Sequence, residues 1–255
     1  MMLGIIGAIY LWNPQRLHYF AKPVQLSKID PDSKALFTKD TRVTVVVGHP
    51  DDAEFYISGT LLKLHQAGAK ITLILVTDGD KGYYPWFLTN AEENRKTRRA
   101  EQAEASKAYD AQIVFLAGPD GRYNPDEPTL RAKLLTTIQE SEPDYLIAFD
   151  DEYILKVQHR DHENSGRATR ELAPQTGAKW LLCFATMAPN YWVDTTGTWE
   201  KRAELLGVHK SQFYGEKLQL IQGTIFDKAT TEGEKIGAET AESFRAIPLD
   251  RSLAR

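Results

Sequence analysis

The sequence predicts an α/β protein, a Rossmann-like three-layer sandwich with a mostly parallel central sheet. Short apolar runs alternate with longer helical segments at least four times along the chain, which is the pattern of repeated βαβ units. Right-handed crossovers bring the carboxyl end of every strand to one edge of such a sheet. Polar clusters follow the first three runs, HPDD, TDGDKG and AGPDG in turn, as expected where this edge binds a ligand.

Five strands are predicted from the apolar runs. Residues 43–48 are rich in β-branched side chains, which is typical of a strand buried on both faces. Residues 70–77 read KITLILVT and give the second strand. Three later runs have the same character, at residues 112–116, 145–149 and 179–184.

Helices are predicted between and after these strands. The first, at residues 55–67, is followed by Gly68, a common stop signal. The second, at residues 91–109, is long, charged and rich in alanine. Four more are expected at residues 128–141, 162–172, 199–206 and 211–223.

The length of 255 residues suits one domain with a substantial core. We expect this domain at residues 41–255, after an irregular lead-in at residues 1–40 that begins with a short apolar segment. That segment, MMLGIIGAIYLW at residues 1–12, is shorter than the roughly 20 residues of a bilayer span. No basic residue precedes it, so it lacks the start of a secretory signal. Packing on the domain, contact with a partner and membrane association stay open for it.

Composition excludes some classes of partner. The net charge is −4, from 31 basic and 35 acidic residues, and no basic stripe of a nucleic-acid-binding protein is present. Cys183 is the only cysteine, so no intrachain disulfide forms, which fits a reducing compartment. We therefore expect no nucleic-acid partner and a cytoplasmic location, with association of residues 1–12 with a membrane as the alternative.

Two histidine- and aspartate-rich clusters predict a metal site. His49 and Asp52 lie three residues apart after the first strand, and this spacing leaves Asp51 between them for another role. His159 and His162 lie after the fourth strand and are one turn apart if that segment is helical. Zinc prefers imidazole nitrogen and carboxylate oxygen. Each cluster alone is also compatible with a helix cap or a solvated loop, but their shared place at strand ends favours a metal.

The chain resembles the LmbE/PIG-L family of zinc-dependent N-acetylglucosaminyl deacetylases. The resemblance covers about residues 42–213 and rests on six motifs in the order of the family. These are HPDDAE at 49–54, TDG at 77–79, RRAE at 98–101, PDG at 119–121, HRDH at 159–162 and HKSQ at 209–212. The sequence departs from the family at Arg160, where HPDH has proline, and at Ser58, where the family has the first of two glycines.

The resemblance implies a role for each matching residue. It implies three zinc ligands, a general base, a histidine that assists the transition state and two residues of the substrate site. These are respectively His49, Asp52 and His162; Asp51; His159; and Arg98 and Asp120. The implied reaction is hydrolysis of an N-acetyl amide on a small amino sugar or glycoconjugate by zinc-bound water that Asp51 activates. A metal-dependent esterase or phosphoesterase acting at the same site is the alternative, because zinc-bound hydroxide also attacks esters.

Other polar and aromatic residues near the predicted edge have two interpretations each. Aromatic side chains at residues 83–87 either stack on a sugar or pack on the core. Asp161 either orients an imidazole or caps a helix. His209 is expected to support the structure and not to bind metal, and residues 150–152 are expected to form a solvated loop.

Overall fold

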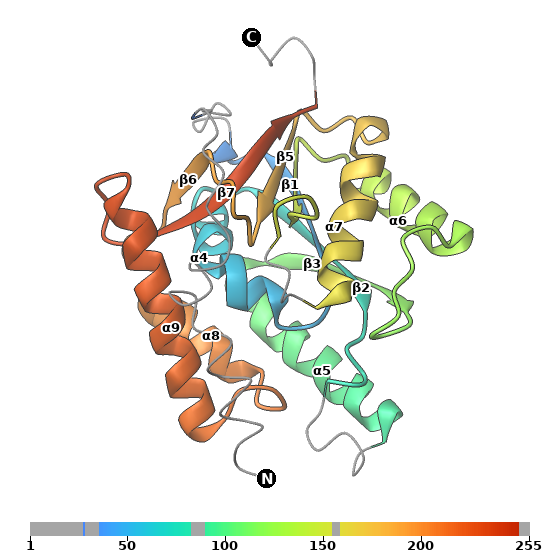
Figure 1. The fold of residues 1–255 in the computed structure, drawn as a ribbon, viewed down its shortest axis with the longest axis horizontal. Helices are drawn as coiled ribbons and strands as arrows, with labels where there is room; N and C mark the ends of the chain where they lie inside the picture. The colour runs from blue at the N-terminus through green and yellow to red at the C-terminus, as the bar shows by residue number, and fades with distance from the viewer. Residues whose placement is uncertain (1–27, 29–35, 83–89, 155–158, 250–255) are drawn as a thin grey trace.

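The computed structural model describes residue 28 and residues 36–82, 90–154 and 159–249. These residues form a seven-stranded sheet in the order β3-β2-β1-β4-β5-β7-β6 (Figure 1). Five strands are parallel neighbours: β1 (Arg42–Val47), β2 (Lys70–Thr77), β3 (Ala111–Gly118), β4 (Tyr145–Phe149) and β5 (Trp180–Phe184). The predicted α/β fold with a mostly parallel sheet is therefore confirmed.

Two antiparallel strands extend the sheet beyond β5 and were not predicted. Strand β7 (Ala241–Pro248) runs antiparallel to β5, and β6 (Tyr191–Asp194) runs antiparallel to β7. The polar residues Glu242 and Arg245 of β7 are only 5% and 7% exposed. Both residues form buried ion pairs, and these pairs allow a strand with charged residues to lie in a buried position.

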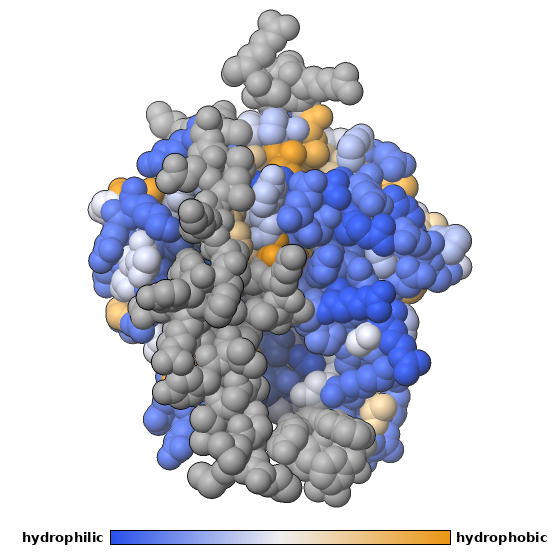
Figure 2. Space-filling view, in the orientation of Figure 1, coloured by the Kyte–Doolittle hydropathy of each residue, from blue (hydrophilic) through white to orange (hydrophobic). Residues whose placement is uncertain are grey.

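Helices cover both faces of the sheet. The described residues form α4 (Asp52–Gln66), α5 (Ala91–Ser106), α6 (Pro128–Glu140), α7 (Arg160–Leu172), α8 (Trp199–Val208) and α9 (Gly215–Glu234). One apolar core joins α4 and α8 to the sheet through residues such as Leu61 and Leu205. A second core joins α6 and α7 to the other face through residues such as Leu134 and Leu172. Figure 2 shows hydrophilic side chains covering α6 and α7 on their outward side.

Helix α9 differs from its predicted extent. It continues to Glu234, past the expected end at Gly223. A glycine inside a helix costs about 1 kcal/mol relative to alanine, and Ile225 and Ala229 beyond it are buried, so packing outweighs that cost. None of the helices formed by the described residues is long and apolar enough to cross a membrane. The apolar segment at residues 1–12 lies outside those residues.

Helix α4 is broken one turn after it begins, at Ile57, whose φ and ψ are −139° and 15°. The first turn carries Asp52, Phe55 and Tyr56, and all three line the same cavity. The break therefore gives the first turn an orientation of its own, separate from the helix behind it.

One buried ion pair holds both sides of this break. Glu242 accepts hydrogen bonds from the backbone N–H groups of Gly59 (3.0 Å) and Thr60 (2.8 Å), which begin the second part of the helix. Arg202 donates to the carbonyls of residues 55–56 in the first part. Arg202 Nη1 and Glu242 Oε1 are 3.0 Å apart. The backbone groups freed by the break thus find partners in side chains from α8 and β7.

Candidate metal centre and active site

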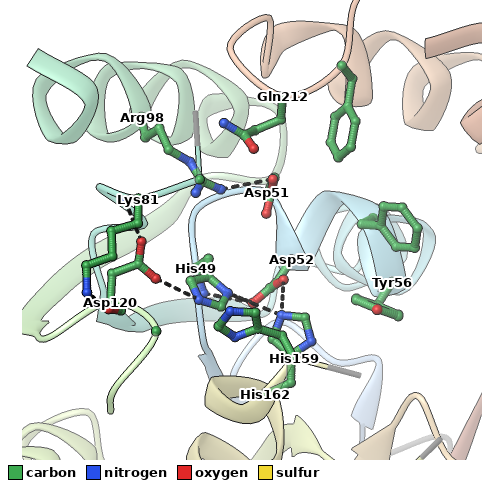
Figure 3. Close-up of a pocket in the computed structure, with 14 residues that line it drawn as sticks. His49, Asp51, Asp52, Tyr56, Lys81, Arg98, Asp120, His159, His162 and Gln212 are labelled. Atoms are coloured by element: carbon green, nitrogen blue, oxygen red, sulfur yellow. Dashed lines mark hydrogen bonds and ion pairs between the residues drawn. The ribbon is translucent and has the colours of Figure 1, made fainter. Parts of the chain in front are cut away.

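The three predicted ligands converge at the carboxyl edge of the sheet (Figure 3). His49 follows β1, Asp52 begins α4 and His162 lies in the first turn of α7. His162 Nε2 lies 3.0 Å from Asp52 Oδ1 and 3.2 Å from His49 Nδ1, and His49 Nδ1 lies 3.6 Å from Asp52 Oδ2. The two clusters, more than a hundred residues apart in sequence, therefore meet as predicted.

The donor set fits a tetrahedral divalent metal ion. Ligand atoms about 2.0–2.1 Å from a zinc ion at tetrahedral angles lie about 3.3 Å from one another. Two of the distances, 3.0 Å from His162 Nε2 to Asp52 Oδ1 and 3.2 Å from His162 Nε2 to His49 Nδ1, lie close to that value. One ligand atom from each of the three residues lies within 4.8 Å of the others. Two imidazoles and one carboxylate also leave a fourth position for water or substrate. These side chains are nearly buried, and we conclude that they form a candidate metal site.

Close packing holds two of the ligands in place. The ring of His162 stacks on Phe149, with centroids 4.2 Å apart and an interplanar angle of 6°. A Cβ atom at Gly48 would lie 3.0 Å from His162 and 3.2 Å from Asp52. A larger residue at position 48 would therefore push against both ligands.

Two carboxylates hold the other nitrogen of His49. Its Nε2 lies 3.2 Å from Asp120 Oδ1 and 3.3 Å from Asp161 Oδ2. Asp161 is fully buried and also accepts the backbone N–H groups of Gly121 and Tyr123. Carboxylates in this position fix the ring orientation of a ligating histidine, so that Nε2 carries the hydrogen and Nδ1 faces the metal. Of the two interpretations of Asp161, the structure supports the one in which it orients an imidazole.

A second group of side chains, His49, His159 and Asp161, also brings ligand atoms within 4.8 Å of one another. Asp161 already accepts two backbone N–H groups. His159 Nδ1 accepts the backbone N–H of Asp161 at 3.2 Å and caps α7. Both oxygens of Asp161 accept backbone N–H groups, whereas only Oδ2 of Asp52 does so and its Oδ1 faces His162, so the group with Asp52 and His162 is the better candidate metal site.

Asp51 lies beside the metal site in a strained backbone conformation. Its φ is 101°, in the left-handed region that non-glycine residues rarely adopt, and such conformations cost about 1–3 kcal/mol. The side chain is 14% exposed and lines the cavity. Burial raises the pKa of Asp51, although Arg98 opposes that shift. A carboxylate near a metal but outside its ligand set is suited to proton transfer.

The two residues implied for the substrate site also line the cavity, with their polar groups engaged inside the protein. Arg98 is 3% exposed and donates to the carbonyls of Gly79 and Pro50 and to Asp51 Oδ2, the last at 3.0 Å. Asp120 accepts the backbone N–H of Lys81 at 2.6 Å and pairs with His49. Their contacts support the base and a ligand, and a direct role in binding substrate stays a prediction.

His159 stands at the cavity opening with its side chain 47% exposed. Partial burial and the neighbouring His49 lower the pKa of His159, which favours the neutral imidazole. Because Nδ1 accepts a backbone N–H, Nε2 of the neutral ring carries the hydrogen. His159 therefore presents a hydrogen-bond donor to a bound molecule.

The cavity measures about 400 Å³ and has an aromatic wall that the sequence did not single out. Phe55, Tyr56 and Phe213 form this wall, and the rings of Phe55 and Phe213 are 6.1 Å apart. Gln212 also lines the cavity and belongs to the HKSQ motif, which was the available signal for this segment. Phe55 and Tyr56 directly follow HPDDAE, but nothing in their spacing separates a cavity wall from a core.

Two other expectations have different outcomes. His209 is fully buried at the end of α8, with Nε2 3.1 Å from Glu54 Oε2, as expected for a support residue. The solvated loop expected at residues 150–152 is wrong for Asp150, which is fully buried and paired with Arg245 at 2.7 Å. Asp150 is followed by two further acidic residues, which is a pattern typical of an exposed loop. Its partner Arg245 lies 95 residues away, so the local sequence does not indicate the pairing. Residues 83–87, which include the predicted aromatic lid, lie outside the described residues.

The chain is similar in sequence and in fold to known deacetylases. Diacetylchitobiose deacetylase from Thermococcus kodakarensis is 24% identical over 240 residues, covering 88% of this chain and 89% of that protein. The structure of N,N′-diacetylchitobiose deacetylase from Pyrococcus horikoshii with its inhibitor MPG has a TM-score of 0.75 and 26% identity, over 83% of this chain and 85% of the other.

A second similar structure belongs to a protein with a different activity. GalB, the 4-carboxy-2-hydroxymuconate hydratase from Pseudomonas putida KT2440, has a TM-score of 0.69 and 15% identity, over 81% of this chain and 96% of the other. The fold alone therefore does not fix the reaction.

The family model described as PIG-L, GlcNAc-PI de-N-acetylase, matches residues 44–173, half of the chain, and includes both candidate metal-binding clusters. The chain therefore belongs to the PIG-L family of de-N-acetylases, as its motifs predicted.

Proposed function

We propose that this protein is a zinc-dependent N-deacetylase that hydrolyses the N-acetyl amide of an amino sugar or a closely related glycoconjugate. The proposal is carried by the convergence of His49, Asp52 and His162, whose ligand atoms lie within 4.8 Å of one another. The carboxylate of Asp51, which is not one of the proposed ligands, lies beside them. Membership of the PIG-L family and the similarity to diacetylchitobiose deacetylases support an amide of an acetylated sugar as the substrate.

Zinc is the proposed metal because it favours the nitrogen and oxygen ligands present, and when bound it polarises a carbonyl and lowers the pKa of bound water towards about 7. Asp51 accepts the proton of the attacking water. Its carboxylate lines the cavity, and a hydrogen bond from Arg98 fixes its direction. General-base assistance of this kind contributes about 10²–10⁴-fold to the rate.

His159 supplies a hydrogen bond to the carbonyl oxygen as negative charge develops on it. The exposed Nε2–H of the neutral ring is the donor, because Nδ1 is held by the backbone of α7. Such a donor typically contributes 10²–10³-fold. As the carbon–nitrogen bond breaks, the amine nitrogen takes up a proton, and the products are acetate and the free amino sugar.

The cavity supports a sugar-sized substrate. Its volume of about 400 Å³ lies within the range of about 300–1,000 Å³ that is usual for small-molecule sites. Aromatic rings of Phe55, Tyr56 and Phe213 offer an apolar surface for the face of a pyranose ring. Lys81 also lines the cavity and could donate a hydrogen bond to a hydroxyl group of such a ring.

We also propose that residues 41–255 form one deacetylase domain after a lead-in at residues 1–40. One sheet includes strands from Arg42 to Pro248, which supports a single domain. A cytoplasmic location is proposed because Cys183 is a free, buried thiol and the chain has no second cysteine.

A screen of acetate release tests the proposal. Zinc-loaded full-length protein is incubated with N-acetylglucosamine, N,N′-diacetylchitobiose and other N-acetyl sugars, and with acetyl esters and phosphoesters for comparison. We expect equal amounts of acetate and free amine from at least one N-acetyl sugar. Hydrolysis of esters or phosphoesters without any N-acetyl sugar would support the alternative reaction. The variant Asp51→Asn is expected to keep its zinc and lose most turnover, and normal turnover in it would contradict the assignment of the base.

A further inference from the structure

A buried polar network lies behind Asp51, and the chemistry described so far does not use it. The backbone of Asp51 has a φ of 101°, so its N–H points away from the turns of α4. That N–H donates to Gln102 Oε1 at 3.1 Å. Gln102 comes from α5 and is fully buried. A residue 51 positions away in sequence therefore holds the backbone of the proposed base.

The orientation of the Gln102 amide follows from its other partners. Its Nε2 donates to Glu54 Oε1 at 2.9 Å and lies 3.1 Å from Ser106 Oγ and 3.3 Å from Tyr109 Oη. The backbone N–H of Asp51 can only donate, so it must face the oxygen of the Gln102 amide, and the NH₂ group then faces Glu54. A flipped amide would set two donors against each other at Asp51 and two oxygen atoms against each other at Glu54.

Glu54 is itself fixed on both oxygens. Tyr109 donates to Oε1 at 2.5 Å, and His209 Nε2 lies 3.1 Å from Oε2. The network is therefore a chain of oriented groups that ends at the N–H of Asp51.

We infer that Gln102 is a positioning residue for the proposed reaction: it keeps Asp51 in its left-handed conformation so that the carboxylate faces the cavity. Arg98 holds the carboxylate, and Gln102 holds the backbone that carries it. The inference rests on the proposed function in taking Asp51 as the base. A misplacement of about 1 Å in a reacting group lowers rates by up to about 10²-fold, which sets the scale of the effect.

The variant Gln102→Met tests this inference, because methionine has a similar length and no acceptor for the Asp51 N–H. We expect kcat to fall by about 10–100-fold, with KM and zinc content unchanged. Ser106→Ala is the matched control, since Ser106 contacts the same amide from within α5 without touching Asp51. Ser106→Ala is expected to change the stability of the protein. Its kcat should stay within about two-fold of the wild-type value.

Two further variants guard against a simple failure to fold. Gln102→Asn keeps a polar amide and withdraws the acceptor, so its kcat should fall as in the methionine variant. Gln102→Glu keeps an acceptor oxygen for the Asp51 N–H, while its second oxygen must carry a proton to face Glu54, so this variant is expected to keep part of kcat. Equal losses of kcat in Gln102→Met and Ser106→Ala, or a loss that appears in KM alone, would overturn the inference.

A structural readout separates this inference from the proposed function. Crystal structures of the methionine and alanine variants report the φ of Asp51 whether or not the protein releases acetate. We expect φ to leave the left-handed region only when the Gln102 acceptor is absent. A positive φ retained in Gln102→Met would overturn the inference. Failure of the wild-type protein to deacetylate any N-acetyl sugar would count against the proposed function alone.

Discussion

Loss of the Glu242 carboxylate should weaken both the fold and the metal site, because Glu242 and Arg202 hold the break in α4. Glu242→Gln keeps the volume of the side chain and removes its charge. The two N–H groups of Gly59 and Thr60 then compete for one amide oxygen, and Arg202, 5% exposed, loses its counterion. Burial lowers the pKa of Arg202, and Glu242 opposes that shift, so the charge of Arg202 depends on its partner.

The size of the effect follows from the burial of this ion pair. Removing one partner of a buried pair costs about 3–5 kcal/mol, because it leaves an uncompensated charge. That is a large fraction of the roughly 5–15 kcal/mol of a typical domain. At about 2–4 °C per kcal/mol for chains near this length, Tm should fall by roughly 6–20 °C. The first turn of α4 carries Asp52, so we also expect weaker retention of zinc.

Urea unfolding and thermal melting of the zinc-loaded protein measure this effect, with Glu204→Gln as the control. Glu204 pairs with Lys201 at 2.9 Å, but both side chains are more than half exposed. Exposed pairs contribute about 0–1 kcal/mol. A Tm for Glu242→Gln equal to that of Glu204→Gln would refute the claim that the buried pair holds the helix break.

Three further predictions concern the metal site. His162→Ala removes one of three protein ligands and should lose zinc, which metal analysis after dialysis would detect; full occupancy would contradict the ligand set. Asp161→Asn weakens the hold on His49 Nε2 and should lower zinc affinity by about 10–100-fold, measured by competition with a chromophoric chelator; an unchanged affinity would count against its orienting role. His159→Ala should lower kcat by about 10²–10³-fold with zinc retained, and unchanged kinetics would exclude it from the reaction.

The parallel part of the fold was predictable because its strands are buried on both faces. Such strands have a continuous apolar sequence, as in residues 43–48 and 70–77. A run of this kind directly indicates a strand that is buried on both faces. The same logic placed HPDD and HRDH at one edge. Both clusters contain residue types that zinc prefers, so the site could be predicted in composition and in place.

Strand β7 could not be predicted for a related reason. Its sequence AESFRAIP mixes charged, polar and apolar residues without a regular period, and charged residues are normally exposed. Glu242 and Arg245 are buried only because Arg202 and Asp150 meet them in three dimensions. Pairing of this kind depends on contacts between distant segments, and no local pattern encodes it. The role of Gln102 was hidden for the same reason, since its partner is a backbone N–H on another helix.

Two adjacent aspartates of identical chemistry receive different roles through their surroundings. Burial alone would raise the pKa of Asp52, but His162 and His49 outweigh it and lower that pKa, which keeps this proposed ligand ionised. At Asp51 burial prevails over Arg98, and its pKa is raised. Environments that move the pKa values of two neighbouring acids apart are typical of sites that separate charge from proton transfer. The left-handed backbone at Asp51 makes this separation possible, since it turns one carboxylate toward Arg98 and leaves the other against the imidazoles.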